Sequence, residues 1–298
     1  MRETLAAVPG ETPAAYRPPA EAADAGSAEA GSAEAGAAAR SAVEEKSGKR
    51  RNLAYPPAPE PLPVPVMDNH THLDFRDGLV EVGVRQALDA AEAVGVRGAV
   101  QVGCDLESSR FTVAALEADP RLLGAVAIHP NDAPPLAAAG TLDGALAEIE
   151  ELAAHPRVRA VGETGLDYFR TRGGGLKVQE YSFRRHIDIA KRLGLALQIH
   201  DRDAHDGVVR ILDAEGAPAR VVFHCFSGGP ELARICNERG WYMSFAGTAT
   251  FRNSMHLREA LLLADPQLVM VETDAPFLTP HPYRGRPNAS YMVPYTVR

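Results

Sequence analysis

From Val66 onward, short apolar runs rich in β-branched residues alternate with longer stretches of helical periodicity. Eight runs are predicted to be strands: 65–70, 96–103, 122–129, 158–163, 195–200, 220–224, 241–245 and 267–272. The stretches between them are predicted to be helices: 80–94, 108–119, 142–155, 178–193, 204–215, 230–239 and 255–264. Eight strands alternating with helices in about 230 residues match the count and size of an α/β fold of the (β/α)8 TIM-barrel type. A doubly wound open sheet is the alternative, but no phosphate-binding glycine fingerprint follows the first run.

The first 65 residues differ in composition from the rest of the chain. They are rich in Ala, Pro, Gly and Glu, carry a tandem Gly-Ser-Ala-Glu-Ala repeat over 26–35, and have only Tyr16 and Tyr55 as aromatic residues. Such a segment buries too little apolar area to offset its loss of conformational entropy. We therefore expect a disordered extension over 1–65, followed by a folded barrel domain over 66–298.

Composition excludes several classes of protein. No apolar run approaches the ~20 residues that span a bilayer, so we expect no membrane association. The three cysteines have no regular spacing, and the N-terminus resembles neither a signal peptide nor an organellar presequence. These features favour a cytoplasmic protein. The net charge of −8 argues against a surface that is basic throughout, although a local basic groove remains compatible with it.

Polar residues stand where the predicted strands end. His70 and His72 are two apart, so their side chains share one face of the first strand. Later strand ends supply four more candidate ligands: Glu163, His200, His224 and Asp274. In a barrel all these ends open onto one mouth. Four imidazoles and two carboxylates are too many for one tetrahedral ion and predict a two-metal site.

The type of ligand narrows the choice of metal and of bridge. Imidazole combined with carboxylate favours Zn, Mn, Fe or Co over a site built purely from oxygen ligands. Two neighbouring cations need an anionic bridge, and Glu163 has one carboxylate oxygen for each. None of the four lysines of the chain ends a strand, so a carboxylated lysine cannot serve instead.

Four motifs in order resemble those of one family. They are the D-x-H-x-H-L-D run at 68–74, G-E-x-G-L-D-Y at 162–168, H-C-F-S-G at 224–228 and E-T-D-A-P at 272–276. Together they resemble the TatD family of metal-dependent deoxyribonucleases, within the amidohydrolase-like barrels, over essentially 66–298. The resemblance implies that His70, His72, Glu163 and Asp274 hold one metal, and that Glu163, His200 and His224 hold the other. It also implies hydrolysis of DNA phosphodiesters, with trimming of single strands from the 3′ end.

The resemblance also suggests catalytic and substrate-binding roles. We expect two divalent ions (Mg, Mn or Zn), Glu163 between them, and Asp274 as the group that accepts or orients the proton of the attacking water. Arg202 is expected to grip a substrate phosphate, with a surface salt bridge as the alternative. Tyr168 is expected to stack on an exposed base, with packing onto the barrel rim as the alternative. His129 is expected to contact substrate or donate a proton.

The sequence departs from the family pattern in two places. Asn131 stands where a second histidine is common in the family. The family usually continues into a helix that covers the last strand, whereas this chain stops at Arg298, so we expect that helix to be missing. Glu272, beside the last candidate ligand, either supports another ligand or forms a buried pair.

Two other functions are compatible with these residues. The same barrel and metals would suit a hydrolase of a small amide, lactone or non-nucleic phosphoester, because function depends on the loops. A non-catalytic binding protein is disfavoured, since all six predicted ligands are present. We expect DNA as the substrate and a monomeric enzyme; nothing in the sequence indicates a protein partner.

Overall fold

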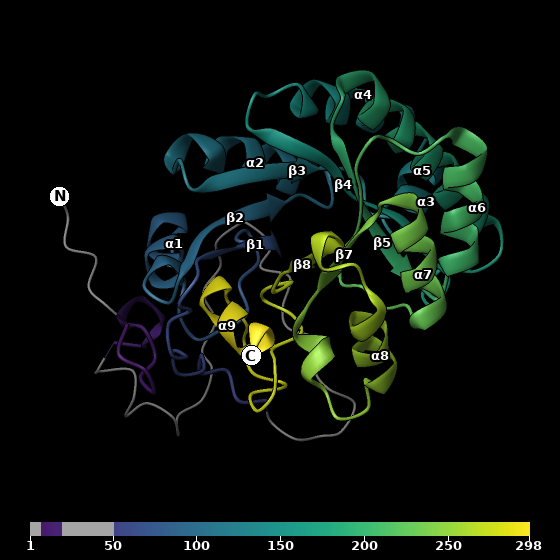
Figure 1. Cartoon of the computed structure of the whole chain (residues 1–298). Helices are drawn as coiled ribbons and strands as arrows, with labels where there is room; N and C mark the ends of the chain where they lie inside the picture. Colours follow the sequence, from purple (N-terminus) through teal and green to yellow (C-terminus); the bar gives the residue numbers. More distant parts are fainter. Residues whose placement is uncertain (1–6, 20–50) are drawn as a thin grey trace.

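The structure is a computed structural model that describes residues 7–19 and 51–298. Eight parallel strands follow one another around a barrel in the order of the sequence, which confirms the predicted TIM barrel (Figure 1). Their bounds are β1 Val66–Thr71, β2 Val96–Val102, β3 Leu122–Val126, β4 Val158–Asp167, β5 Ala196–Arg202, β6 Val221–Phe223, β7 Tyr242–Phe245 and β8 Val269–Val271.

Helices surround the strands on the outside of the barrel (Figure 1). Their bounds are α1 Val84–Glu92, α2 Leu106–Ala118, α3 Ala133–Ala138, α4 Leu142–Ala153, α5 Gly174–Leu193, α6 His205–Glu215, α7 Pro230–Arg239, α8 Met255–Leu263 and α9 Val293–Val297. The described residues also form short 3-10 turns at Ala14–Tyr16, Gly247–Thr250, Pro266–Leu268 and Ser290–Met292. Sequence periodicity missed α3 and α9 because six and five residues, with prolines in the first turn, are too short to show a repeat.

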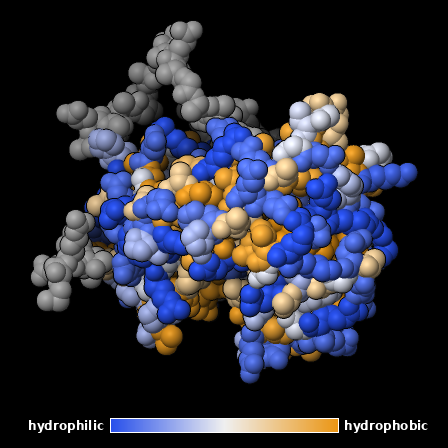
Figure 2. Space-filling model, turned by 90° about the horizontal axis from the view of Figure 1, so that it is seen from above, coloured by the Kyte–Doolittle hydropathy of each residue, from blue (hydrophilic) through white to orange (hydrophobic). Residues whose placement is uncertain are grey.

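The core lies between the barrel strands and the helices packed on them. In α5 the buried residues Phe183, Ile187 and Ala190 recur at helical spacing and join the main hydrophobic cluster. On the face shown in Figure 2, hydrophilic side chains predominate and hydrophobic ones appear in smaller patches among them. Among the helices that the structure describes, none combines the length and the apolar character needed to cross a membrane.

Strands β4 and β5 run farther than the sequence predicts, and their pairing continues to Asp167 opposite Arg202. Gly165 makes this possible. Its φ is +142°, and a Cβ at this position would lie 2.1 Å from the carbonyl oxygen of His200. Only glycine combines that dihedral with so close an approach of two strands. The close pairing brings the second half of β4, which begins with Glu163, beside His200.

The seam between β1 and β8 closes the barrel at its mouth. The backbone N–H of Asp274 donates to the carbonyl oxygen of His70 at 2.9 Å, and that of His72 donates to Ala275 at 2.7 Å. Beneath these bonds, the buried carboxylate of Asp68 accepts from the backbone N–H and the hydroxyl of Thr273, at 2.8 and 2.6 Å. The seam therefore fixes the positions of His70 and His72 relative to Asp274.

The expected disorder of residues 1–65 requires a correction for the two parts that the structure describes, 7–19 and 51–65. Tyr16 and Tyr55 are buried, and the Tyr16 ring packs edge-on against the rings of Tyr55 and Tyr291. The two parts also pair with each other, since the backbone N–H of Gly10 donates to the carbonyl oxygen of Ala58 at 3.0 Å. Residues 1–6 and 20–50 of the expected extension lie outside the described residues.

The C-terminal segment packs against these N-terminal parts and against α1. Tyr291, Met292 and Val293 are fully buried in a cluster that contains Tyr16 and Tyr55. Helix α9 contacts β8, yet the three residues of β8 are only half-buried. In Figure 1 the N-terminal 3-10 turn lies on the side of the barrel occupied by α1 and α9.

Candidate metal centre

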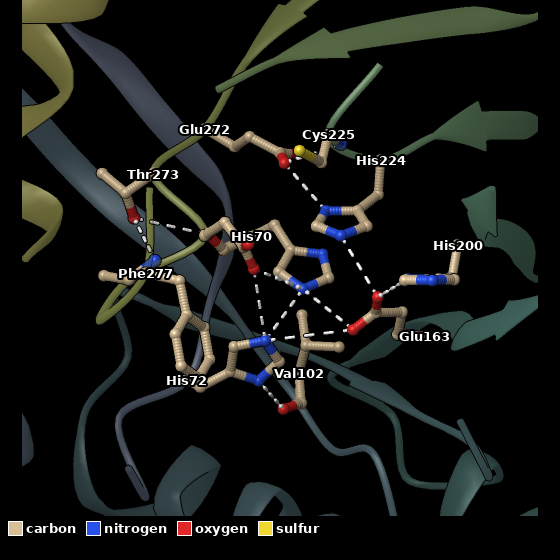
Figure 3. A network of polar contacts seen from close by, with 12 residues as sticks. His70, His72, Val102, Glu163, His200, His224, Cys225, Glu272, Thr273 and Phe277 are labelled. Carbon is tan, nitrogen blue, oxygen red and sulfur yellow. Dashed lines mark hydrogen bonds and ion pairs between the residues drawn. The ribbon is translucent and has the colours of Figure 1, made fainter. Parts of the chain in front are cut away.

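Imidazole and carboxylate side chains converge at the carboxyl end of the barrel (Figure 3). They come from β1 and the residue after it, the middle of β4, the last residues of β5 before Arg202, and the residues that follow β6 and β8. All six residues predicted as metal ligands take part: His70, His72, Glu163, His200, His224 and Asp274. His70 is completely buried and Glu163 is 5% exposed, so these polar atoms face one another rather than bulk water.

A first group of donors surrounds the histidines of β1. The Nε2 atoms of His70 and His72 lie 3.1 Å apart. Oε2 of Glu163 lies 3.6 Å from the first of these nitrogens and 3.9 Å from the second. Oδ1 of Asp274 lies 3.7 and 3.5 Å from the same two atoms. Four donor atoms thus face one small space.

A second group gathers at the other oxygen of Glu163. Oε1 lies 2.6 Å from Nδ1 of His200, 3.2 Å from Nε2 of His224 and 3.7 Å from Nε2 of His129. The carboxylate therefore turns one oxygen towards each group of donors. The ring of His70 stacks on that of His224 at 3.6 Å, which keeps the two groups adjacent.

His129, expected to contact substrate or to donate a proton, forms a compact donor group with Glu163 and His200. Strand β3 ends at Val126, so His129 lies on the loop after it rather than at the strand end. The backbone N–H of His129 donates to the carbonyl oxygen of Cys104 at 2.7 Å, and its Nδ1 accepts from the N–H of Asn131 at 3.1 Å. These bonds turn Nε2 towards His200, 3.3 Å away.

The donor set suits divalent transition-metal ions. Ligands bound at ~2.0–2.2 Å from one ion lie about 3–4 Å from each other. Most donor distances within both groups fall in this range, and only the 2.6 Å contact of Glu163 with His200 is shorter. Imidazole and carboxylate are the ligands of such ions, whereas buried carboxylates and imidazoles without a cation leave many polar atoms poorly paired. The residues present therefore fit a pair of ions that share Glu163.

Without metal, the charges of the cluster shift its titration. Burial alone would lower the pKa of His72, but its contact with Asp274 and the charge of Glu163 raise it to about 9. In the same way, burial opposes but Asp167 and Glu163 together raise the pKa of His200 to about 8. Burial and the neighbouring His200 lower the pKa of His129 to about 3, so this ring is neutral at pH 7.

The opposite charges also keep the central carboxylate ionised. Burial alone would raise the pKa of Glu163, but the surrounding histidines, above all His224 and His129, hold it well below its usual range. In the metal-free cluster, protonated His72 and His200 therefore lie beside ionised carboxylates, whereas His129 is neutral. Glu272 and Glu163 also raise the pKa of His224 well above its usual range, although burial alone would lower it. Divalent ions would therefore have to displace protons from His72, His200 and His224.

Two histidines contact supporting groups through the ring nitrogen that faces away from the other donors. Nδ1 of His72 lies 2.9 Å from the carbonyl oxygen of Val102. Nδ1 of His224 lies 2.8 Å from Oε1 of the fully buried Glu272. Such contacts fix the ring orientation of a metal-binding histidine. Of the two interpretations of Glu272, the structure favours support of a ligand.

Asp167 plays a similar part for His200 and was missed in the sequence. Its Oδ2 lies 3.4 Å from Nε2 of His200 and accepts from the side-chain amide of Asn131 at 2.8 Å. The signal was present, because Asp167 belongs to the G-E-x-G-L-D-Y motif. Asn131, which stands where a histidine is common in the family, is therefore a neutral donor to a carboxylate. Cys104, also missed, lies 3.5 Å from Oε2 of Glu163, and burial raises the pKa of its thiol.

The two other predicted substrate contacts differ in exposure. Arg202 is exposed, and its guanidinium carbon lies 4.2 Å from the ring centre of Phe169. Tyr168 is half-buried against the main hydrophobic cluster, as the alternative of rim packing described. Phe169, in contrast, is 54% exposed. Of the aromatic residues on this loop, Phe169 is therefore the accessible one.

A family model described as TatD related DNase matches residues 67–298. The chain belongs to the TatD family. It is 48% identical over 237 residues to the metal-dependent hydrolase TatD of Mycobacterium tuberculosis, an alignment that covers 78% of this chain and 88% of that protein. It is 36% identical to the metal-dependent hydrolase YabD of Bacillus subtilis, over 77% of this chain and 88% of the relative.

A solved structure shares the fold of this TatD-family protein. The TatD homologue YjjV of Escherichia coli superimposes with a TM-score of 0.67 at 26% sequence identity, covering 78% of this chain and 88% of the other. Family, relatives and the cluster of candidate metal ligands agree on the general activity. This TatD-family protein is a metal-dependent hydrolase.

Proposed function

We propose that this protein hydrolyses DNA phosphodiester bonds with two divalent metal ions and trims single strands from their 3′ ends. The observation that carries the proposal is the carboxylate of Glu163, which offers one oxygen to each of two donor groups at the barrel mouth. Membership in a family described as TatD related DNase supports DNA as the substrate.

The ligands divide between two ions. His70, His72, Glu163 and Asp274 would hold one, and Glu163, His200 and His224 the other, with His129 also within reach of the second. The ions are Mg, Mn or Zn. When bound, they make a water molecule more acidic and neutralise negative charge that builds on the phosphate.

Asp274 accepts or orients the proton of the attacking water. Its side chain is 14% exposed at the mouth, so it reaches both the first donor group and the substrate space. Burial alone would raise the pKa of this carboxyl, but its contact with His72 and the nearby histidine charges lower it. Asp274 is therefore ionised at neutral pH, as a proton acceptor must be. Glu163 acts as the shared ligand.

The substrate contacts lie on the rim beside this centre. Arg202 binds a substrate phosphate with its planar guanidinium, which Phe169 supports from below. His129 is neutral at pH 7, so it acts as a ligand or hydrogen-bonding group rather than as a proton donor. Tyr168 remains a predicted contact, with most of its ring packed on the rim.

The setting of the enzyme is part of the proposal. All three cysteines are free, which agrees with a reducing compartment, and we propose that the enzyme acts in the cytoplasm as a monomer. The net charge of −8 disfavours tight binding of DNA to the protein alone. Binding of DNA therefore depends on the metal ions and the nearby arginines.

Turnover of labelled single-stranded DNA tests the proposal. Metal-stripped protein is given Mg, Mn or Zn, and its products are compared on 3′- and 5′-labelled oligonucleotides. We expect metal-dependent shortening from the 3′ end, with kcat reduced about 10²–10⁴-fold by Asp274→Asn. Asp213→Asn, at an exposed carboxylate on α6, is the matched control and retains the activity. No cleavage with any ion, despite two metals bound per chain, would contradict DNA hydrolysis and favour the small-substrate hydrolase.

A further inference from the structure

Two phenylalanine rings at the mouth have no part in the chemistry described so far. Phe75 lies on the loop after β1, and Phe277 lies on the turn after β8. Their ring centres are 5.7 Å apart at an interplanar angle of 66°. Both rings also contact His72 edge-on, at 5.6 and 6.2 Å. Figure 3 shows Phe277 directly beside His72 and the first group of donors.

Phe277 is exposed although its backbone is firmly held. The residue is 46% exposed. Its backbone N–H donates to the carbonyl oxygen of Asp274 at 2.8 Å, so the aromatic ring and the catalytic carboxylate share one turn. The side-chain amide of the buried Asn288 donates to the carbonyl oxygens of Phe277 and Thr273, at 2.6 and 3.0 Å. The backbone that carries the Phe277 ring at the mouth is thus held by hydrogen bonds.

A flat apolar ligand is the chemical match for such a ring. Covering its exposed area recovers hydrophobic free energy, and the braced backbone needs little further ordering when the ligand binds. Among the described residues, no arginine or lysine stacks on this ring, in contrast to Phe169 with Arg202, so the ring itself offers no further partner for a phosphate. Next to a phosphate held at the metal centre, the flat apolar part of a nucleotide is its base.

We propose that Phe277, backed by Phe75, stacks on the unpaired base of a nucleotide that flanks the phosphate under attack. The proposal rests on the proposed DNA hydrolysis and deepens it. Every base has an aromatic face, so the contact tolerates any sequence. A base within a duplex is paired and stacked on its neighbours, so it would have to be unstacked first. Stacking on Phe277 therefore favours single strands and frayed ends.

Substrates that lack one base test whether a base stacks on Phe277. Single-stranded oligonucleotides carry a tetrahydrofuran residue on either side of the terminal phosphodiester, and KM and kcat are compared with those of the intact strand. For the wild type we expect the missing base on one side to raise KM about tenfold or more. In Phe277→Ala this difference between intact and abasic strands disappears. Phe277→Trp restores it, because an indole ring also stacks.

The control variant and the possible outcomes distinguish the stacking proposal from the proposed DNA hydrolysis on which it rests. Tyr181→Ala removes an exposed ring on the outer face of α5 and is expected to discriminate as the wild type does. If intact DNA is cleaved but neither abasic position raises KM, or if Phe277→Ala keeps the full discrimination, the proposed stacking on Phe277 is wrong, whereas the proposed DNA hydrolysis is retained. If neither the wild type nor any variant cleaves any oligonucleotide, DNA hydrolysis itself is wrong, and the proposed stacking on Phe277 is rejected with it.

Discussion

At the scale of single residues, the candidate centre depends on groups behind the ligands as much as on the ligands. Glu272 shows this, because its Oε1 lies 2.8 Å from Nδ1 of His224 and also accepts from the backbone N–H of Cys225 at 2.8 Å. We predict that Glu272→Gln weakens metal binding about 10–100-fold, since a neutral amide no longer orients and polarises the imidazole.

Calorimetric titration of the metal-free protein with Mn²⁺ measures this effect. Glu148→Gln, at an exposed carboxylate paired with Arg110, is the control and should bind Mn²⁺ with unchanged affinity. An affinity of Glu272→Gln equal to that of the wild type would show that Glu272 does not support the metal centre.

Protonation of the free site predicts how metal affinity depends on pH. The pKa values of about 9 for His72 and about 8 for His200 mean that both rings carry a proton at pH 7. Each ion must displace such a proton, so affinity is low in acid and increases as pH rises towards these values. We predict a gain in Mn²⁺ affinity of about tenfold or more per pH unit between pH 6 and 8, because the second group also contains His224, whose pKa is raised. An affinity that stays flat over this range would contradict the assigned proton displacement.

The predictability of single residues followed their place on the strands. His70, His72, Glu163, His200 and His224 stand at or directly after barrel strands, so alternation and topology sufficed to bring them together. The donor role of His129 was missed because a loop turns its ring, and a loop conformation has no periodicity. The exposed Phe277 was missed because a lone aromatic residue in a turn looks the same in sequence whether it packs or binds.

At the scale of elements, the strands were predictable and the segments that wrap the barrel were not. Repeated apolar runs reveal strands, since each must bury both of its faces. The N-terminal segments 7–19 and 51–65 have no such pattern, and their docking depends on two tyrosines within a proline-rich composition. Average composition therefore predicted disorder where specific aromatic packing prevails.

The docking of these segments predicts a measurable loss of stability. Tyr16 is 4% exposed between Tyr55 and Tyr291, so Tyr16→Ala leaves a cavity. We predict that it lowers the free energy of unfolding by about 3 kcal/mol, measured by urea denaturation. Tyr181→Ala, at an exposed ring, should change this free energy by less than about 0.5 kcal/mol. Equal effects of the two substitutions would mean that the N-terminal segments do not contribute to the stability of the barrel.

At the scale of the whole molecule, the barrel follows from the alternation of strands and helices. The side chains at the carboxyl ends of its strands all lie at one mouth. The sequence sufficed for this because parallel strands joined by helices place every carboxyl end on one side. It did not suffice to place Asp167 behind His200, since that contact depends on the extension of β4 and β5 past Gly165. Under the proposed function, the negative charge of the whole chain would make the metal ions the main attraction for a DNA backbone.

The number of divalent ions per chain tests the central claim most directly, because one carboxylate is proposed to serve two ions. Bound metal is counted by mass spectrometry and calorimetry in the wild type, in Glu163→Gln and in the surface control Glu148→Gln. We predict two ions per chain in the wild type and the control, and weaker binding at both sites in Glu163→Gln. A single ion in the wild type, or a Glu163→Gln variant that binds two ions with wild-type affinity, would contradict the shared centre.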